Sequence, residues 1–203
     1  MRKAKLMIGV SGAQGGGKST LLKAMAELGY NVDPFKVSRA VQAKLGWESL
    51  DRVMSSPKAM MEFQAEVFKQ KRANDVMALA ADRTGIVLTE RTFADLHAYT
   101  SLWTLRFVDQ EKLLIDDAQD FLADYFEYCL QAQTDLYDGT VLLPLMSHIA
   151  WESDPNRASE HDAEQVYNDV QLFVQLLEEP SFTITAESVQ DRAQQVQTFI
   201  RSL

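Results

Sequence analysis

The sequence predicts an α/β fold with a five-stranded parallel sheet covered by helices on both faces, in three layers. Short, almost continuously apolar segments alternate with longer segments whose apolar residues recur at helical spacing, the pattern of strands and crossover helices. The first strand-like segment leads through a glycine cluster directly into a helix. A chain of 203 residues that is 46% hydrophobic can bury one sizeable core, so we expect one domain over residues 1–203.

Five short segments are expected to form the strands. They cover residues 5–11, 30–33, 85–90, 140–145 and 182–185. The first is nearly all apolar, as expected for a strand that is buried on both faces of a parallel sheet. Pro34 follows the second strand, Gly85 begins the third, and the Asp138-Gly139 turn precedes the fourth. These residue types interrupt regular structure, so they delimit the strands.

The segments between the strands are expected to be helical. They cover residues 20–28, 37–45, 57–82, 92 onward, 114–132, 166–177 and 187 onward. Gly29 is expected to end the first of them. Thr92-Phe93-Ala94-Asp95 has the form of a capping box and therefore predicts a helix start. Residues 147–162 are polar and aperiodic, which is typical of a loop.

Composition excludes several classes of protein. Twenty basic against 29 acidic residues give a net charge of -9, so the chain repels nucleic acid and acidic lipid at long range and must grip any polyanion locally. Its apolar runs are far shorter than the roughly 20 residues of a membrane-spanning helix. Cys129, the single cysteine, lies in an apolar helical stripe and is expected to be a buried thiol. We therefore expect a cytoplasmic protein, and a homodimer is left open.

The glycine cluster carries the clearest motif in the chain. Residues 12–19 read Gly-Ala-Gln-Gly-Gly-Gly-Lys-Ser and match the phosphate-binding pattern G-x-x-x-x-G-K-[ST], with a strand before and a helix after. Glycines let backbone N–H groups turn inward at the positive end of the helix. Lys18 would lie between the β- and γ-phosphates of ATP, and the Ser19 hydroxyl would ligate Mg²⁺. The predicted nucleotide-binding residues are Gly12, Ala13, Gln14, Gly15, Gly16, Gly17, Lys18, Ser19 and Thr20.

The other polar residues that follow strands suggest phosphoryl transfer. Asp33 ends the second strand and Glu90-Arg91 end the third, and in a parallel sheet these ends meet at the edge that holds the glycine loop. With this loop, Phe63-Gln64 and an arginine in the 147–162 segment, the chain resembles P-loop nucleoside and nucleoside-monophosphate kinases. It is most similar to the branch with viral deoxynucleotide kinases and ribosylnicotinamide kinases. That order of parts runs over most of the chain.

The resemblance implies a role for each of these parts. It implies that the helical segments 36–82 and 92–135 bind the acceptor and that residues 147–162 form a lid. The implied catalytic residues are Lys18, Asp33, Glu90, Arg91 and the lid arginine Arg157. The implied acceptor-binding residues are Asp33, Lys36, Arg39, Gln64 and Arg91. The third strand ends in Glu90 where related proteins have an Asp, so Glu90 is the candidate second magnesium ligand beside Ser19.

We expect transfer of the γ-phosphoryl group of ATP, with Mg²⁺, to a deoxynucleoside monophosphate, because Lys36 and Arg39 can hold an acceptor phosphate. A nucleoside kinase is the first alternative. A kinase acting on DNA or on a modified base in DNA is another, since Lys69, Lys71 and Arg72 can form a short basic groove, although they also suit the solvated side of a helix. A P-loop ATPase or switch is the remaining alternative.

Overall fold

The computed structural model describes residues 5–33, 35–145 and 160–203. These residues form one sheet with the strand order β2-β3-β1-β4-β5, in which every neighbouring pair is parallel. The strands are β1 (Leu6–Ser11), β2 (Asn31–Asp33), β3 (Ile86–Glu90), β4 (Gly139–Leu142) and β5 (Ser181–Thr183). The predicted five-stranded parallel sheet is confirmed, although β4 ends three residues before the predicted position.

Helices connect the strands close to the predicted places. They are α1 (Lys18–Glu27), α2 (Val37–Lys44), the 3₁₀ helix η1 (Leu50–Ser55), α3 (Pro57–Ala81), α4 (Phe93–Asp109), α5 (Ile115–Leu136), α6 (Glu160–Gln175) and α7 (Val189–Ser202). The short η1 was not expected from the pattern. In α4 the predicted capping box between Thr92 and Asp95 is confirmed. Helix α3 begins with Pro57, and the Ser56 hydroxyl accepts from the backbone N–H of Ala59 at 3.1 Å.

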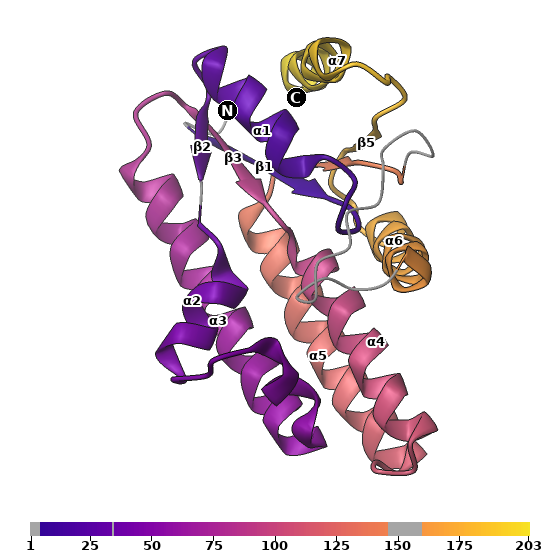
Figure 1. Ribbon diagram of the computed structural model, residues 1–203. Helices are drawn as coiled ribbons and strands as arrows, with labels where there is room; N and C mark the ends of the chain where they lie inside the picture. Colours follow the sequence, from indigo (N-terminus) through magenta and orange to yellow (C-terminus); the bar gives the residue numbers. More distant parts are fainter. Residues whose placement is uncertain (1–4, 34, 146–159) are drawn as a thin grey trace.

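Three layers follow from alternating side chains along the strands. Ile8 and Val10 of β1 point to one face, where they pack in a core cluster with residues of α1 and α7. Met7 of β1 and Val87 of β3 point to the other face, where the core is formed with α3, α4, α5 and α6. Figure 1 shows α2, α3, α4 and α5 extending well beyond the sheet.

A glycine in β1 lets α4 begin directly against the sheet. A Cβ atom on Gly9 would lie 2.5 Å from the Thr92 methyl group and 3.3 Å from the Tyr137 ring. Real Cβ atoms do not approach other atoms so closely, so a side chain here would push the start of α4 away. The close contact brings the segment after β3 beside the glycine loop after β1.

The helical segments that the resemblance assigned to the acceptor coincide with α2 to α3 and with α4 to α5. The predicted lid and its Arg157 lie outside the described residues, except that residues 160–162 belong to the first turn of α6. In the part of the chain that the structure describes, no helix is both long and apolar enough to cross a bilayer.

Candidate active site

The glycine loop joins β1 to α1 at the carboxyl end of the central strand. There β1 lies between β3 on one side and β4 on the other, so the order in which the chain adds strands to the sheet changes direction at β1. Ligands usually bind at such a switch point in this architecture. Gly12 has φ +135°, and a Cβ there would lie 2.4 Å from the Leu143 carbonyl oxygen. No other residue fits that position. The loop leads into the first turn of α1, whose backbone N–H groups can bind phosphate.

Lys18 lies folded over this loop. Its ammonium donates to the carbonyl oxygens of Gly12 at 2.5 Å and Ala13 at 2.9 Å, and Lys18 is 7% exposed. Burial lowers the pKa of Lys18, while the negative charge of Asp95 opposes that shift. The carbonyl contacts are ones that phosphate oxygens can replace, so the ammonium is placed to bind an anion in the loop.

Ser19, Glu90 and Lys36 meet at one point beside the loop. The Ser19 hydroxyl lies 3.1 Å from both carboxylate oxygens of Glu90, and the Lys36 ammonium lies 2.5 Å from Oε2 of Glu90. Burial by itself raises the pKa of Glu90, but the hydrogen bond and charge of Lys36 outweigh it and hold this pKa below its ordinary value. Glu90 therefore presents a charged carboxylate next to Ser19.

The Ser19 and Glu90 oxygens have the chemistry of a magnesium site. Mg²⁺ takes hard oxygen ligands and in nucleotide sites uses one or two protein groups together with phosphates. The hydroxyl and carboxylate are close enough to ligate one ion from the same side. Among the described residues, no group of three or more His, Cys, Asp and Glu side chains is arranged to hold a metal.

Arg91 has a strained backbone at the end of β3. Its φ is +62°, a region that non-glycine residues rarely adopt and that is concentrated at functional sites. Its guanidinium donates to the Ser38 hydroxyl at 3.2 Å and lies 5.2 Å from the centre of the Tyr99 ring. The arginine is thus directed toward α2, between the two predicted acceptor-binding segments.

Asp95 links the loop to the start of α4, a role that the sequence reasoning missed. Its fully buried carboxylate accepts from the Ser11 hydroxyl at 2.7 Å, from the N–H of Gly12 at 3.1 Å and from the N–H of Thr92 at 2.7 Å. Nearby, the Tyr99 hydroxyl accepts from the N–H of Gln14 at 3.2 Å. The capping-box pattern identified Asp95, but it carries no information about partners on β1.

Asp33 is held from two sides at the end of β2. Its Oδ1 accepts from the N–H of Phe35 at 3.2 Å, and its Oδ2 accepts from the amide of Asn74 on α3. Arg39, on α2, is exposed. Asn74 was not among the predicted site residues, because its contact with β2 depends on how α3 packs.

Gln64 lies in the interior, 2% exposed, and its side-chain nitrogen has no hydrogen-bond partner among the described residues. A buried amide without a partner costs about 1–3 kcal/mol. Beside it, Phe63 stacks on Trp47 with ring centres 5.6 Å apart. Gln64 thus offers hydrogen-bond donors that no described residue uses.

For Lys71 both alternatives given for the basic residues of α3, a basic groove and the solvated side of a helix, are wrong. Lys69 and Arg72 are largely exposed and pair with Glu66 and Asp135. Lys71, however, is 2% exposed and forms an ion pair of 2.7 Å with Asp75 inside the protein. A helical stripe of polar residues was read as the solvated side, whereas this lysine has a buried partner four residues along.

Comparison with known proteins places the chain in a family. The family model described as "AAA domain" matches residues 7–192. The chain belongs to the AAA domain family. The glycine loop, Glu90 and α4 all lie inside the matched segment.

One relative and two structural neighbours of this AAA domain chain are kinases by name. The probable deoxycytidine kinase of Fowlpox virus (strain NVSL) is 24% identical over 157 residues, which are 76% of this chain and 63% of that protein. The chain thus spans less than two thirds of that relative's length. Two structures of deoxyadenosine kinase from M. mycoides match 97% of this chain and 99% of theirs, with TM-scores of 0.65 and 0.63 and identities of 14% and 15%. One contains dATP, the other the products dCMP and a flexible dCDP.

These matches confirm the resemblance to P-loop kinases and the fold class. The described residues of the AAA domain share the parallel-sheet architecture of the deoxyadenosine kinase over almost their entire length.

Proposed function

We propose that the protein is a deoxynucleoside kinase, which transfers the γ-phosphoryl group of ATP to the primary hydroxyl of a deoxynucleoside. The observation that carries the proposal is the meeting of the phosphate-binding loop with the ends of β2 and β3. Lys18 and Ser19 lie in the first turn of α1, where the loop ends. Glu90 is the last residue of β3 and Arg91 follows it, while Asp33 ends β2. A phosphoryl-transfer site needs few other groups from the protein.

ATP would bind with its triphosphate in the loop. The N–H groups of the loop and of the first turn of α1 surround the phosphate oxygens, and Lys18 neutralises charge between the β- and γ-phosphates. Mg²⁺, bound with the nucleotide, would be held by Ser19 and Glu90 and would neutralise charge on the same oxygens. Lys36 pairs with Glu90 at 2.5 Å, so it adds a second positive charge close to this place.

The transfer itself forms one bond and breaks another. The acceptor hydroxyl oxygen attacks the γ-phosphorus, the bond from that phosphorus to the bridging oxygen breaks, and ADP leaves with the bonding electron pair. The hydroxyl proton passes to Asp33, which acts as the base. Arg91 stabilises the negative charge spread over the transferred group.

The acceptor would be recognised through Gln64 and the aromatic residues around it. A glutamine amide whose buried nitrogen has no partner among the described residues can bind a base edge, because the side chain carries a donor beside an acceptor. Phe63, the preceding residue of α3, stacks on Trp47. Binding of a base would satisfy an amide that is otherwise buried at a cost.

A deoxynucleoside is favoured over the deoxynucleoside monophosphate expected from the sequence. That expectation needed Lys36 and Arg39 as a pair of cations for the acceptor phosphate. Lys36 is bonded to Glu90 instead, so one of the two cations has another use. The relatives are a probable deoxycytidine kinase and a deoxyadenosine kinase, whose names refer to nucleoside acceptors.

One assay separates the possible acceptors. The protein is incubated with Mg²⁺ and γ-labelled ATP together with a deoxynucleoside, a deoxynucleoside monophosphate, a single-stranded oligonucleotide or water alone. We expect label in the deoxynucleoside monophosphate product. Label only in a deoxynucleoside diphosphate identifies a monophosphate kinase, and label in the oligonucleotide identifies a DNA kinase. Release of labelled phosphate at the same rate with and without an acceptor identifies an ATPase. Each of the last three results would overturn the proposal.

A further inference from the structure

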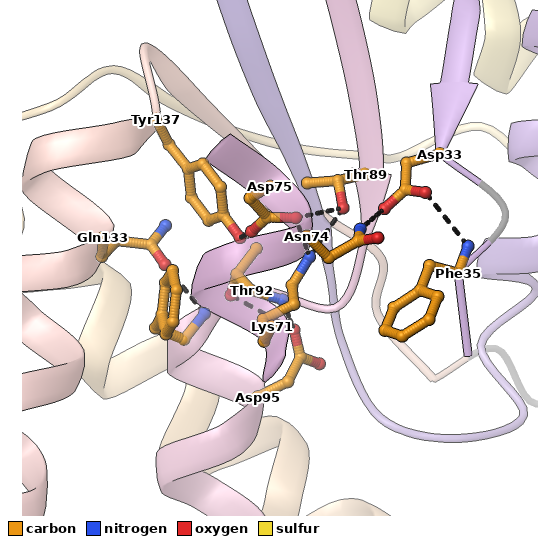
Figure 2. A network of polar contacts seen from close by, with 11 residues as sticks. Asp33, Phe35, Lys71, Asn74, Asp75, Thr89, Thr92, Asp95, Gln133 and Tyr137 are labelled. Carbon is orange, nitrogen blue, oxygen red and sulfur yellow. Dashed lines mark hydrogen bonds and ion pairs between the residues drawn. The ribbon is translucent and has the colours of Figure 1, made fainter. Parts of the chain in front are cut away.

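A polar network on α3, buried at Lys71 and Asp75 and half-buried at Asn74, lies beneath the ends of β2 and β3. Asn74 and Asp75 come three and four residues after Lys71, so all three lie on one face of the helix. Figure 2 shows their side chains pointing toward Thr89 of β3 and Asp33 of β2, with Tyr137 closing the network from the other side. Asp33 belongs to the candidate active site, whereas the other residues of the network have no assigned role.

Two of these residues fix how α3 sits against the sheet. The Lys71 ammonium donates to Asp75 at 2.7 Å and to the Thr89 hydroxyl at 2.6 Å, and the Tyr137 hydroxyl donates to Asp75 at 2.6 Å. Asp75 is fully buried. Moving the partners of a buried charged group away strongly destabilises the protein. These contacts therefore hold the helix at one rotation and one height relative to β3.

This fixed position brings Asn74 to Asp33. Thr89 and Asp33 are direct partners in the register of β2 and β3, so a helix face held at Thr89 also reaches the end of β2. The Asn74 amide donates to Oδ2 of Asp33, while the N–H of Phe35 donates to Oδ1 at 3.2 Å. Figure 2 shows both contacts. With one donor on each oxygen, the carboxylate plane cannot rotate freely.

We propose that Asn74 is a positioning residue, which orients the Asp33 carboxylate so that its remaining lone pairs face the acceptor hydroxyl. This inference rests on the proposed function, in which Asp33 accepts the proton of that hydroxyl. Each carboxylate oxygen has two lone-pair directions, and the contacts with Asn74 and Phe35 use one on each. A base acts in the transition state only at hydrogen-bonding distance and in the correct direction.

The test compares Asn74→Ala with Asn168→Ala, which makes the same change at an exposed position of α6. Alanine favours helix, so neither variant should unfold, and thermal unfolding followed by circular dichroism checks this. We expect Asn74→Ala to lower kcat for the deoxynucleoside about 10-fold, with a change of less than about 3-fold in its KM. Asn168→Ala should match the parent. Asn74→Gln, which keeps an amide donor, should recover part of the lost kcat.

A double variant separates positioning from a merely structural contact. In an Asp33→Ala background, Asn74→Ala should have no further effect on kcat, because the residue acts through Asp33. Equal kcat for Asn74→Ala and the parent, or the same loss in the presence and absence of Asp33, would overturn the inference and leave the proposed function intact. A parent protein that phosphorylates no deoxynucleoside would overturn both.

Discussion

The buried pair of Lys71 and Asp75 allows a quantitative prediction. The two side chains are 2% and 0% exposed, and the ammonium lies 2.7 Å from the carboxylate. Replacing Lys71 with Met removes the cation and leaves Asp75 buried, with the hydroxyls of Thr89 at 3.2 Å and Tyr137 at 2.6 Å as its remaining donors. We therefore expect a substantial loss of stability.

The size of the loss follows from these contacts. Removing one member of a buried ion pair costs about 3–5 kcal/mol. Since Asp75 keeps two hydroxyl donors, Lys71→Met should cost about 3 kcal/mol, near the lower end. Asp75→Leu leaves the ammonium with the Thr89 hydroxyl and should cost about 4 kcal/mol by the same reasoning. The double variant has no unpaired buried charge, so it should cost no more than Lys71→Met alone.

Urea unfolding followed by circular dichroism measures these free energies for the parent, both single variants and the double variant. The expected result is a double variant whose loss is far below the roughly 7 kcal/mol sum of the two single losses. Additive losses, or a loss below about 1 kcal/mol for Lys71→Met, would refute the buried pairing. Arg72→Ala removes a more exposed cation on the same helix and serves as the control, with an expected cost of less than about 1 kcal/mol.

Two further predictions concern the interior of the site and the pH dependence of stability. Gln64→Met should raise the KM for the deoxynucleoside about 10-fold in steady-state assays, yet leave the free energy of unfolding unchanged or raise it by about 1 kcal/mol, because the buried side-chain nitrogen has no partner among the described residues to lose; a large drop in stability with unchanged KM would contradict its assigned role. Burial lowers the pKa of His97 from 6.5 to about 4, so the unfolded chain binds a proton at this residue between these two pH values while the folded chain does not. This contribution to stability is therefore present above pH 6.5 and is lost as the pH falls to about 4, by up to about 3 kcal/mol. His97→Phe, which packs against the same Phe126 and Phe173 rings, should remove this part of the slope in urea unfolding at several pH values; an unchanged slope would show that His97 is not the cause.

Local signals in the sequence were enough for the framework and for the glycine loop. The apolar run before Gly12, the glycine cluster and the helical pattern after it each reflect interactions within a few residues, so the strand, loop and helix could be predicted. The capping box of Thr92 and Asp95 is local in the same sense. The parallel sheet of five strands followed from the alternation of strands and helices together with the resemblance to P-loop kinases, whereas the order of the strands was not predicted.

Contacts between distant segments could not be predicted in the same way. Lys71 looked like a solvated helix residue, because its second partner, Thr89, is 18 residues away and its burial depends on how α3 packs. Asp95 was recognised as a cap, but its bonds to Ser11 and Gly12 cross more than 80 residues. Lys36 was assigned to the acceptor from charge alone, without the position of Glu90.

The most direct test of the central claim is a single-turnover reaction with γ-labelled ATP, Mg²⁺ and a deoxynucleoside, run with the parent and with Lys18→Ala. The parent should place the label on the primary hydroxyl of the deoxynucleoside, and the folded Lys18→Ala protein should transfer none, because the ammonium that lies over Gly12 and Ala13 is the one that neutralises the transferred phosphate. Undiminished transfer by Lys18→Ala, or no labelled acceptor with the parent, would contradict this account.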